Sequence, residues 1–484
     1  MSNSESILAE RTQWIGGREV DSTGDEVMCI HDPADGSAFA DVPVGHPKDA
    51  EGAVTAAAEA WNDWAELSPA KRGMQLRLAA TKMDGISDRL ADTLVHENGK
   101  TIGEARAEIG MCRPWMETYC ELGLQLAGRS VQTAGDEILF QYCNPRGVSV
   151  CLNTWNAPVI AAIEMVVANL VVGNTVVLKT SERAPLATRM MFQECFDHLP
   201  AGVLNVVNGD GPNMGAPLVS HPGTSLVCFI GSVNVGRKIG EAAGGRICKA
   251  VLELGGKDAY IVDDTVDPVA AAEFIMPTCY ALSGQICSST ERIYVMRNVY
   301  EPFVERLAAL ASDLKVGPGM DESSQMGPMI DETILANVER QVEEAVGAGA
   351  TAVVGGKRLE REGYFYAPTV LTDVEDGMLL MHEETFGPVA PVRVIDSFEE
   401  GLKRTNDSGF GLCANVLTES APRGIKAIHQ LQAGVVRINA ARGGILHCSQ
   451  EPAKDSGIGM GHGMEFLHEL TYRKSVRWQG SISS

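Results

Sequence analysis

Five short apolar segments separated by helical patterns constrain the fold of this chain most strongly. They are VSVCLN (148–153), TVVLKT (175–180), VLNVVNG (203–209), SLVCFIG (225–231) and AVLELGG (250–256). Helical patterns lie between them, for example over 185–198 and 233–243. Apolar strands that alternate with helices are typical of a parallel sheet covered by helices on both faces. The sequence therefore predicts a doubly wound α/β fold.

A second series of strands and helices follows Gly256. Its apolar segments are AYIVDD (259–264), RIYVM (292–296), ANVLT (414–418) and GVVRIN (434–439), with helical patterns near 268–282 and 300–314. A chain of 484 residues also exceeds the size of one ordinary core. We therefore expect two α/β units in series, with a ligand site in the cleft between them.

The region before the first strand series has two different patterns. Helical periodicity covers 49–67 and continues over 71–97, and Asn98-Gly99 is typical of a helix C-terminus. Extended patterns replace it between 128 and 150, where Ile138–Tyr142 is the clearest strand. The segment 144–147, with the sequence NPRG, is typical of a turn.

Charge and composition exclude several classes of partner. The formal net charge is −23 and no run of Lys or Arg occurs, which argues against nucleic acid and anionic membranes. The apolar stretch 157–173 contains Glu164 and Asn169 and is too short and polar to span a bilayer. The N-terminal segment lacks the apolar core of a secretory signal. Twelve scattered cysteines without a CxxC pair then indicate reduced thiols in a cytoplasm, and no metal is expected.

Three loops after strands could bind a nucleotide. The glycine-rich turn 209–215 has one residue too many for a dinucleotide fingerprint. In the turn 231–236, Ser232 could cap a helix whose free N–H groups face an anion. Lys179 and Glu182, at the carboxyl end of a strand, could bind ribose hydroxyls. An ordinary strand–helix junction and a solvated charge pair are the alternative interpretations.

Three side chains are candidates for the chemistry. Cys287 lies in the glycine-containing segment SGQICSST, whereas Cys228 lies inside an apolar strand as a core cysteine would. Glu253 interrupts the apolar run VLELGG, so it is a general base or part of an internal salt bridge. Asn156 follows a buried strand and could stabilise an oxyanion or simply cap a turn.

Taken in order along the chain, these segments resemble the aldehyde dehydrogenase superfamily. The matching motifs are W-N-x-P (155–158), K-x-x-E (179–182), G-S-x-x-x-G (231–236), E-L-G-G-K (253–257), G-Q-x-C (284–287) and E-E-x-F-G-P (383–388). The similarity extends from Trp14 to Val476. It implies two Rossmann-like doubly wound domains and a small β-hairpin oligomerisation element. The segment GQICSSTERI is similar to members of the benzaldehyde, salicylaldehyde and vanillin type.

The resemblance also implies roles for these residues. Cys287 would attack the aldehyde as a thiolate, and Asn156 with the backbone N–H of Cys287 would hold the oxyanion. Glu253 would activate the water that hydrolyses the resulting thioester. The residues implied to bind the cofactor are Trp155, Lys179, Glu182, Gly211, Gly231, Ser232, Gly236, Leu254, Glu384 and Phe386.

Two of the implied residues bear on the type of reaction. The carboxylate of Glu182 would repel a 2′-phosphate, so the sequence favours NAD⁺ over NADP⁺. Family members that transfer the acyl group to coenzyme A generally lack the glutamate at Glu253, which favours hydrolysis. Coenzyme A acylation and a catalytically silent NAD-binding relative are the alternatives.

The C-terminal motif departs from the family pattern P-F-G-G-x-K-x-S-G-x-G. Gln450 replaces its aromatic residue, and Arg442 and His447 precede it, while Glu164 lies in the helix after Asn156. These four residues predict a polar substrate mouth. Arg442 would suit a carboxylate and Glu164 an amine, so the charge of the substrate stays open, as does a rim position without ligand contact.

The resemblance implies a division into domains. The NAD-binding domain is expected over 1–127 and 148–255, the catalytic domain over 256–442, and a loop returning to the NAD-binding side over 443–464. An oligomerisation element is expected from 128–147 and 465–484 in a homodimer or homotetramer. The extended edge Ile138–Tyr142 would then be covered by a partner chain.

Overall fold

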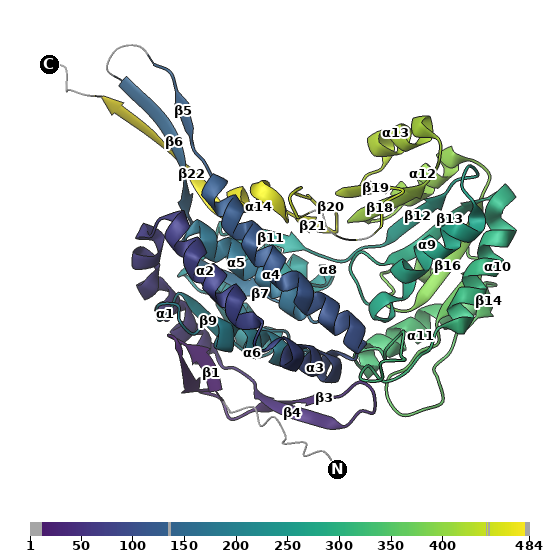
Figure 1. Cartoon of the computed structure of the whole chain (residues 1–484), viewed down its shortest axis with the longest axis horizontal. Helices are drawn as coiled ribbons and strands as arrows, with labels where there is room; N and C mark the ends of the chain where they lie inside the picture. The colour runs from purple at the N-terminus through teal and green to yellow at the C-terminus, as the bar shows by residue number, and fades with distance from the viewer. Residues whose placement is uncertain (1–11, 134–136, 442, 444–445, 480–484) are drawn as a thin grey trace.

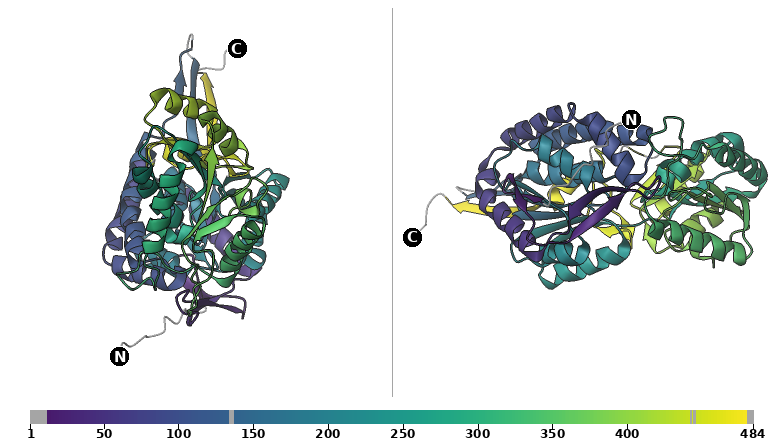
Figure 2. Two further views of the ribbon diagram at one scale, coloured as in Figure 1. Left: turned by 90° about the vertical axis from the view of Figure 1, so that its right-hand side faces the viewer. Right: turned by 90° about the horizontal axis from the view of Figure 1, so that it is seen from below.

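Two α/β lobes lie side by side, and a narrow sheet extends from the first lobe (Figure 1). The computed structural model describes residues 12–133, 137–441, 443 and 446–479. The view from below shows helices packed against both faces of the first-lobe sheet (Figure 2). This arrangement confirms the predicted α/β fold with two units in series.

The first lobe is built on an eight-stranded sheet with the order β2-β1-β9-β8-β7-β10-β11-β21. The five predicted strands form its parallel centre: β7 (Val148–Leu152), β8 (Thr175–Lys179), β9 (Leu204–Val207), β10 (Thr224–Ile230) and β11 (Lys249–Glu253). Antiparallel edges are formed by β1 (Thr12–Ile15), β2 (Arg18–Asp21) and β21 (Gly457–Ile458). Parallel pairing brings the carboxyl ends of β7, β8, β10 and β11 to one edge, where ligands bind in open α/β sheets.

Alternate residues of these strands face two separate helix layers. Cys151 packs with α2 (Pro69–Met83), α3 (Ser87–Asn98), α4 (Ile102–Gln125), α5 (Pro158–Val172) and α6 (Leu186–Cys195). Val150 and Leu152 pack on the other face with α1 (Pro47–Glu66), α7 (Ala216–Ser220) and α8 (Val233–Gly245). The continuous pattern over 71–97 is in fact two helices, since α2 ends before Asp84 and α3 begins at Ser87.

The second lobe contains a seven-stranded sheet with the order β14-β15-β16-β13-β12-β18-β19. Its strands are β12 (Asp258–Val262), β13 (Thr290–Met296), β14 (Thr351–Val354), β15 (Thr369–Thr372), β16 (Val389–Ile395), β18 (Cys413–Leu417) and β19 (Val435–Ile438). All pair in parallel except β14 with β15. The helices are α9 (Pro268–Tyr280), α10 (Arg297–Asp313), α11 (Glu332–Gly347), α12 (Phe398–Asn406) and α13 (Ala421–Gln430).

Segments near both ends of the chain bridge or border the lobes. A hairpin of β3 (Val27–His31) and β4 (Ala38–Pro43) lies at the base of the first lobe (Figure 1). Further along, β20 (Ala453–Lys454) pairs with β17 (Phe410–Gly411) of the second lobe, and β21 pairs with β11 of the first. The C-terminal segment therefore crosses from one lobe to the other beside the cleft.

The extending sheet has the order β22-β6-β5, from β5 (Arg129–Val131), β6 (Glu137–Pro145) and β22 (Thr471–Gln479). Ile138–Tyr142 lies in β6, the central strand, so its prediction as an edge is wrong. Its partner is β22 of the same chain, which pairs with β6 along nine residues. The same pairing draws Asn144 and Pro145 into β6, so the predicted turn shrinks to Arg146 and Gly147. The short helix α14 (Gly463–Glu469) precedes β22 and contacts α4 and α5.

The described helices include none that is both long and apolar enough to cross a membrane. Within the same residues, no disulfide joins any two of the twelve cysteines.

Candidate active site

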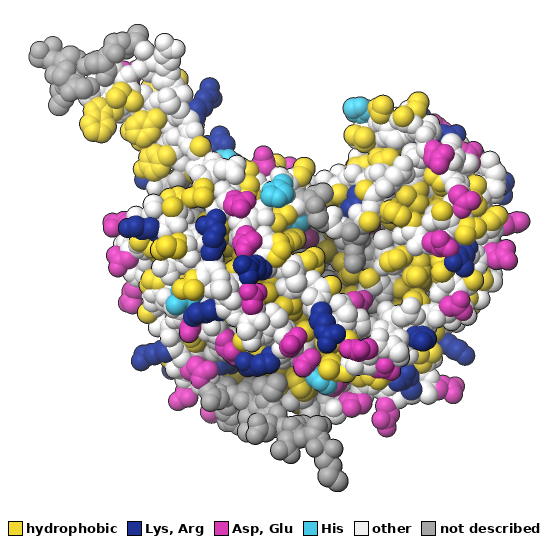
Figure 3. Space-filling model, in the orientation of Figure 1, with side chains coloured by type: hydrophobic (Ala, Val, Ile, Leu, Met, Phe, Trp, Pro, Cys, Tyr) yellow, Lys and Arg dark blue, Asp and Glu magenta, His cyan; other side chains and the backbone are white. Residues whose placement is uncertain are grey.

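A cavity of about 370 Å³ opens between the lobes and brings Cys287, Glu253 and Asn156 together. The molecule is hollowed between the two lobes on the face shown in Figure 3. Glu253 ends β11, Asn156 follows β7, and Cys287 follows α9 in the second lobe. Residues that are 131 positions apart in sequence thus meet where the first-lobe strands end.

The loop before Cys287 has an unusual backbone. Leu282, Ser283 and Gly284 all have positive φ values, of 52°, 56° and 73°. A Cβ atom on Gly284 would lie 2.1 Å from the carbonyl oxygen of Gly387, so only glycine fits there. Left-handed non-glycine residues are costly and persist where surrounding contacts fix them, commonly at functional sites. The glycine in the G-Q-x-C motif thus shapes the loop that presents Cys287.

Asn156 is held on this same loop by hydrogen bonds. Its Oδ1 accepts a hydrogen bond from Thr154 Oγ1 at 2.9 Å, and its Nδ2 donates to the carbonyl oxygen of Gln285 at 3.0 Å. Lys100 Nζ donates to the carbonyl oxygen of Asn156 at 3.0 Å. These contacts fix which end of the Asn156 amide carries the N–H donors. That end lies against Gln285, two residues before Cys287. An amide nitrogen has two such donors, so one can still reach an oxygen in the cavity.

Glu253 lies beside the cysteine. Its Oε1 is 3.7 Å from Sγ of Cys287. Burial raises the pKa of Glu253 to about 7, and the negative charge of Glu164 adds to the rise. In the described part of the chain, Glu253 forms no ion pair with Lys or Arg, which disfavours the salt-bridge alternative. A carboxyl group that titrates near neutrality suits a general base.

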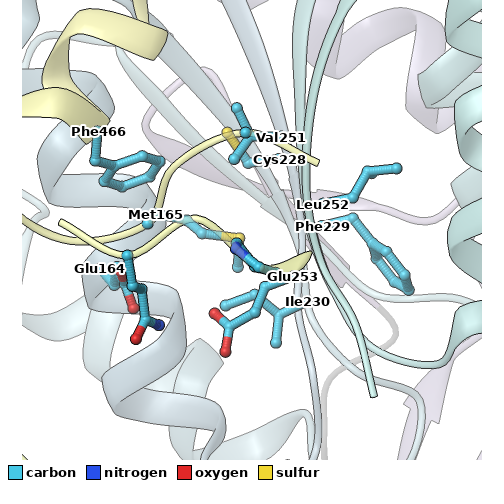
Figure 4. Close-up of a pocket in the computed structure, with 13 residues that line it drawn as sticks. Glu164, Met165, Cys228, Phe229, Ile230, Val251, Leu252, Glu253 and Phe466 are labelled. Atoms are coloured by element: carbon cyan, nitrogen blue, oxygen red, sulfur yellow. The ribbon is translucent and has the colours of Figure 1, made fainter. Parts of the chain in front are cut away.

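Glu164 lies deep in the site rather than at a polar mouth. It projects from α5 beside a small cavity that Glu253 also lines (Figure 4). Its Oε1 forms an ion pair with Nε2 of His462 at 3.2 Å, and it accepts hydrogen bonds from the backbone N–H of His462 at 3.3 Å and from the hydroxyl of Tyr119 at 3.4 Å. Burial disfavours a charged imidazole, but Glu164 and then Glu253 outweigh it and raise the pKa of His462 to about 9.

His462 was not found from the sequence. Its only sequence signal is indirect: a glutamate inside the apolar helix 157–173 needs a buried partner. Nothing in the local pattern around His462, which precedes α14, identifies it as that partner.

The residues predicted to bind the cofactor begin at the end of β8. Lys179 Nζ donates a hydrogen bond to Glu182 Oε2 at 3.0 Å, and the glutamate side chain is exposed. Ser232 caps α8, with its Oγ accepting from the N–H of Val235 at 3.5 Å. These groups supply carboxylate oxygens and helix N-terminal N–H groups, the donor and acceptor types that ribose and pyrophosphate need.

Glu384 and two aromatic rings border the same side. Glu384 Oε1 accepts a hydrogen bond from the N–H of Gly256 at 2.9 Å. Burial, followed by the charge of Glu291, raises the pKa of Glu384 to about 8. The rings of Trp155 and Phe386 pack edge to face, with centroids 5.3 Å apart. The carboxyl thus lies beside the loop that follows Glu253, and Trp155 of the ring pair directly precedes Asn156.

Two of the three predicted glycines, Gly231 and Gly236, are closely packed, whereas Gly211 is not. A Cβ on Gly236 would lie 2.4 Å from Cδ2 of Leu254, and one on Gly231 would lie 2.4 Å from the ring of Phe229. Gly211 begins a short π-helical turn and would meet no atom within 4 Å. The open space at Gly211 and the donor set at β8 and α8 together fit a dinucleotide.

The predicted substrate residues separate into three groups. Glu164 and Gln450 line the cavity. His447 is exposed and does not belong to its lining. Arg442 lies outside the described residues. A second missed residue, Arg437 of β19, lines the cavity from the second lobe.

Comparison with known proteins identifies the family. A family model described as the aldehyde dehydrogenase family matches residues 20–476. The chain belongs to the aldehyde dehydrogenase family. This aldehyde dehydrogenase is 35% identical to alpha-ketoglutaric semialdehyde dehydrogenase of Bacillus subtilis (strain 168), over 91% of this chain and 92% of the relative.

Solved structures support the same assignment. Lactaldehyde dehydrogenase from Escherichia coli superposes with a TM-score of 0.95 and 32% identity, covering 98% of this chain and 100% of the other. An NAD⁺ complex of aldehyde dehydrogenase from Bacillus cereus gives a TM-score of 0.94 and 31% identity, covering 97% and 96%. The protein is therefore an NAD(P)-dependent enzyme that oxidises an aldehyde to a carboxylic acid, which confirms the predicted reaction.

Proposed function

We propose that this aldehyde dehydrogenase forms a thioester on Cys287 and hydrolyses it with water activated by Glu253. The observation that carries the proposal is the 3.7 Å separation between Cys287 Sγ and Glu253 Oε1, with Asn156 bonded to the same loop. A nucleophile, a base and an amide donor around one cavity are what acyl transfer needs.

Each of these residues has one part in the proposed reaction. The Cys287 thiolate bonds to the aldehyde carbon, and the oxygen that becomes negative accepts hydrogen bonds from Asn156 and from the backbone N–H of Cys287. A bound nicotinamide dinucleotide supplies the hydride acceptor, which leaves the carbon as a thioester. Glu253 then takes a proton from the attacking water, and the carbon–sulfur bond breaks to release the carboxylate and the thiolate.

NAD⁺ is the proposed cofactor in preference to NADP⁺. Although the Glu182 side chain is exposed, partial desolvation of its carboxyl opposes ionisation, but the adjacent Lys179 outweighs this effect and lowers the pKa. The ionised group can accept bonds from ribose hydroxyls and repels a 2′-phosphate. A relative from Bacillus cereus has been solved as an NAD⁺ complex. We expect Glu182→Gln to lower the ratio of kcat/KM for NAD⁺ to that for NADP⁺ about tenfold, from the loss of one charge contact.

The cofactor is assigned to the domain formed by 1–127 and 148–255. The catalytic domain is assigned to 256–442, the returning loop to 443–464, and the oligomerisation element to 128–147 and 465–484. Ile138 and Trp478 on the extending sheet are 58% and 62% exposed, and apolar side chains gather there (Figure 3). Contiguous exposed apolar side chains mark interaction surfaces, so we propose a homodimer or homotetramer. The proposed location, a cytoplasm, rests on the cysteine pattern instead. Light scattering of Trp478→Ser tests the assembly.

Product analysis separates the proposal from its alternatives. Purified enzyme, NAD⁺ and an aldehyde should yield free carboxylic acid at the same rate with and without coenzyme A. A product that appears only as a coenzyme A thioester would replace hydrolysis by acylation. Absence of nicotinamide reduction with every aldehyde, despite NAD⁺ binding, would favour a silent relative. The panel should include benzaldehyde-like compounds, because the similarity around Cys287 predicts them.

A further inference from the structure

The charged side chains that line the substrate cavity are unequally paired. On the first-lobe wall, Glu108 forms a buried ion pair with Lys100. Glu108 Oε1 also accepts hydrogen bonds from the N–H groups of Val159 and Ile160 at 2.9 and 3.2 Å. Both oxygens of this carboxylate therefore have partners before any ligand enters.

Two of the other three acids on this wall are also occupied, and the third is Glu253, the proposed base. Glu104 Oε2 accepts a bond from the N–H of Thr101 at 2.9 Å, and its Oε1 accepts one from the N–H of Leu282 at 2.6 Å. Glu164 is paired with His462. These carboxylates already form hydrogen bonds or ion pairs within the protein, so they are poor candidates for recognising a cationic substrate.

Arg437 on the opposite wall differs. Its Nη1 donates one long hydrogen bond, of 3.3 Å, to Oδ1 of Asn415. Its Nε is buried and has no hydrogen-bond partner. Over the residues that the structure describes, no carboxylate lies within ion-pair distance of Arg437, although every other cation lining the cavity has one.

Asp258 interacts electrostatically with Arg437, but the two form no ion pair among the described residues. Asp258 Oδ1 accepts a hydrogen bond from the N–H of Cys413 at 3.0 Å, and its Oδ2 is buried without a partner. Burial raises the pKa of Asp258 to about 7, so the carboxyl is partly neutral at physiological pH. Cys413 also packs beside Cys287. The guanidinium therefore lies on the wall that carries the reacting cysteine.

We propose that Arg437 binds a carboxylate of the substrate, so that the enzyme oxidises aldehydes bearing a second, anionic group. The inference rests on the proposed function of Cys287 in the same cavity. A guanidinium binds a carboxylate through charge-assisted, commonly paired hydrogen bonds. Met111, Trp115, Ile160 and Leu412 also line the cavity and offer apolar contacts to the carbon chain between the two ends.

The test compares 4-oxobutanoate with its methyl ester, which has the same chain and no charge. Wild-type enzyme should have a kcat/KM for the acid about 10- to 100-fold higher than for the ester, the usual value of a charge-assisted bond. Arg437→Gln should remove this preference by raising KM for the acid, and leave the ester unchanged. Arg437→Lys should restore part of it.

Other outcomes would overturn the assignment. Equal use of acid and ester by wild type, or an acid preference that survives in Arg437→Gln, would remove Arg437 from substrate binding. If the enzyme oxidises other neutral aldehydes but neither 4-oxobutanoate nor its methyl ester, anionic aldehydes are excluded as the substrate class. If no aldehyde is oxidised, the thioester proposal fails instead. In that case, the ability of succinate to protect Cys287 from an alkylating reagent tests Arg437 independently of turnover. Protection lost in Arg437→Gln would support carboxylate binding, and equal protection would overturn it.

Discussion

On the first-lobe wall of the cavity, Glu104, Glu108 and Glu164 all accept hydrogen bonds from the chain, whereas Arg437 on the second-lobe wall has no acidic partner among the described residues. A buried charge that is paired contributes mainly to holding the fold, and breaking the pair leaves its partner exposed to the full cost of desolvation. A group without a partner is left for the ligand. Apart from Glu253, the proposed base, the two walls therefore separate charges that hold the fold from the charge left for a ligand, and mutations should show that separation.

Cys287→Ala should have the largest effect. The nucleophile is lost, so we expect kcat for aldehyde oxidation to fall about 10³-fold or more, as when catalytic nucleophiles are removed. Thermal stability should change little, because Cys287 is only half-buried. Nicotinamide reduction and a melting curve measure both quantities.

The matched control for this variant is Cys448→Ala, at an exposed cysteine. It should keep full activity and stability. Turnover that persists in Cys287→Ala would assign the chemistry to another group.

Glu108→Ala should have the opposite pattern. The side chains of Lys100 and Glu108 are 2% and 5% exposed, so the variant leaves a buried ammonium group unpaired. We expect a loss of about 3–5 kcal/mol in stability, the typical cost of breaking a buried pair from one side. Chemical denaturation of wild type and variant measures it.

Arg89→Ala provides the comparison for this loss. Arg89 pairs with Glu194 on the surface, where the side chains are 59% and 40% exposed, and removing such a pair costs about 0–1 kcal/mol. Equal stability losses for Glu108→Ala and Arg89→Ala would contradict a structural role for the first-lobe pair.

The parallel strands and the reacting residues were accessible to sequence analysis because each carries a local pattern. The apolar runs of β7 to β11 need burial on both faces, and a glutamate at the end of one of them is conspicuous. Helix α4 was missed, because Pro114 and four glutamates interrupt its apolar periodicity. Local patterns therefore identify those helices and strands whose apolar periodicity is uninterrupted along their length.

Long-range partners were not accessible. The central position of Ile138–Tyr142 depends on β22, which lies about 330 residues later in the chain. Arg437 alternates with apolar residues in GVVRIN like any half-exposed strand position. Whether an arginine has an acidic partner is a property of the packed cavity, and no spacing in the sequence encodes it.

The smallest expected effect concerns the pH dependence of Glu253. The charges facing it are the Glu164 carboxylate, which raises its pKa, and the His462 imidazolium, which lowers it by a smaller amount. A base works only when ionised, so activity should rise with pH through about 7 in wild type. Glu164→Gln removes the larger influence. The pKa of Glu253 should fall and the acidic limb of the pH–rate profile should move to lower pH.

His462→Gln reverses the sign of this shift and is therefore the matched variant. With the cation gone and Glu164 kept, the pKa of Glu253 should rise and the acidic limb should move to higher pH. The profile of kcat is measured with a single aldehyde under conditions where hydrolysis limits turnover. Plateau rates should change less than the position of the limb, because neither residue contacts the reacting carbon in the proposed mechanism. Shifts in the same direction for both variants would mean that Glu164 and His462 affect the pKa of Glu253 through packing rather than through charge. This ion pair would then have a structural role only.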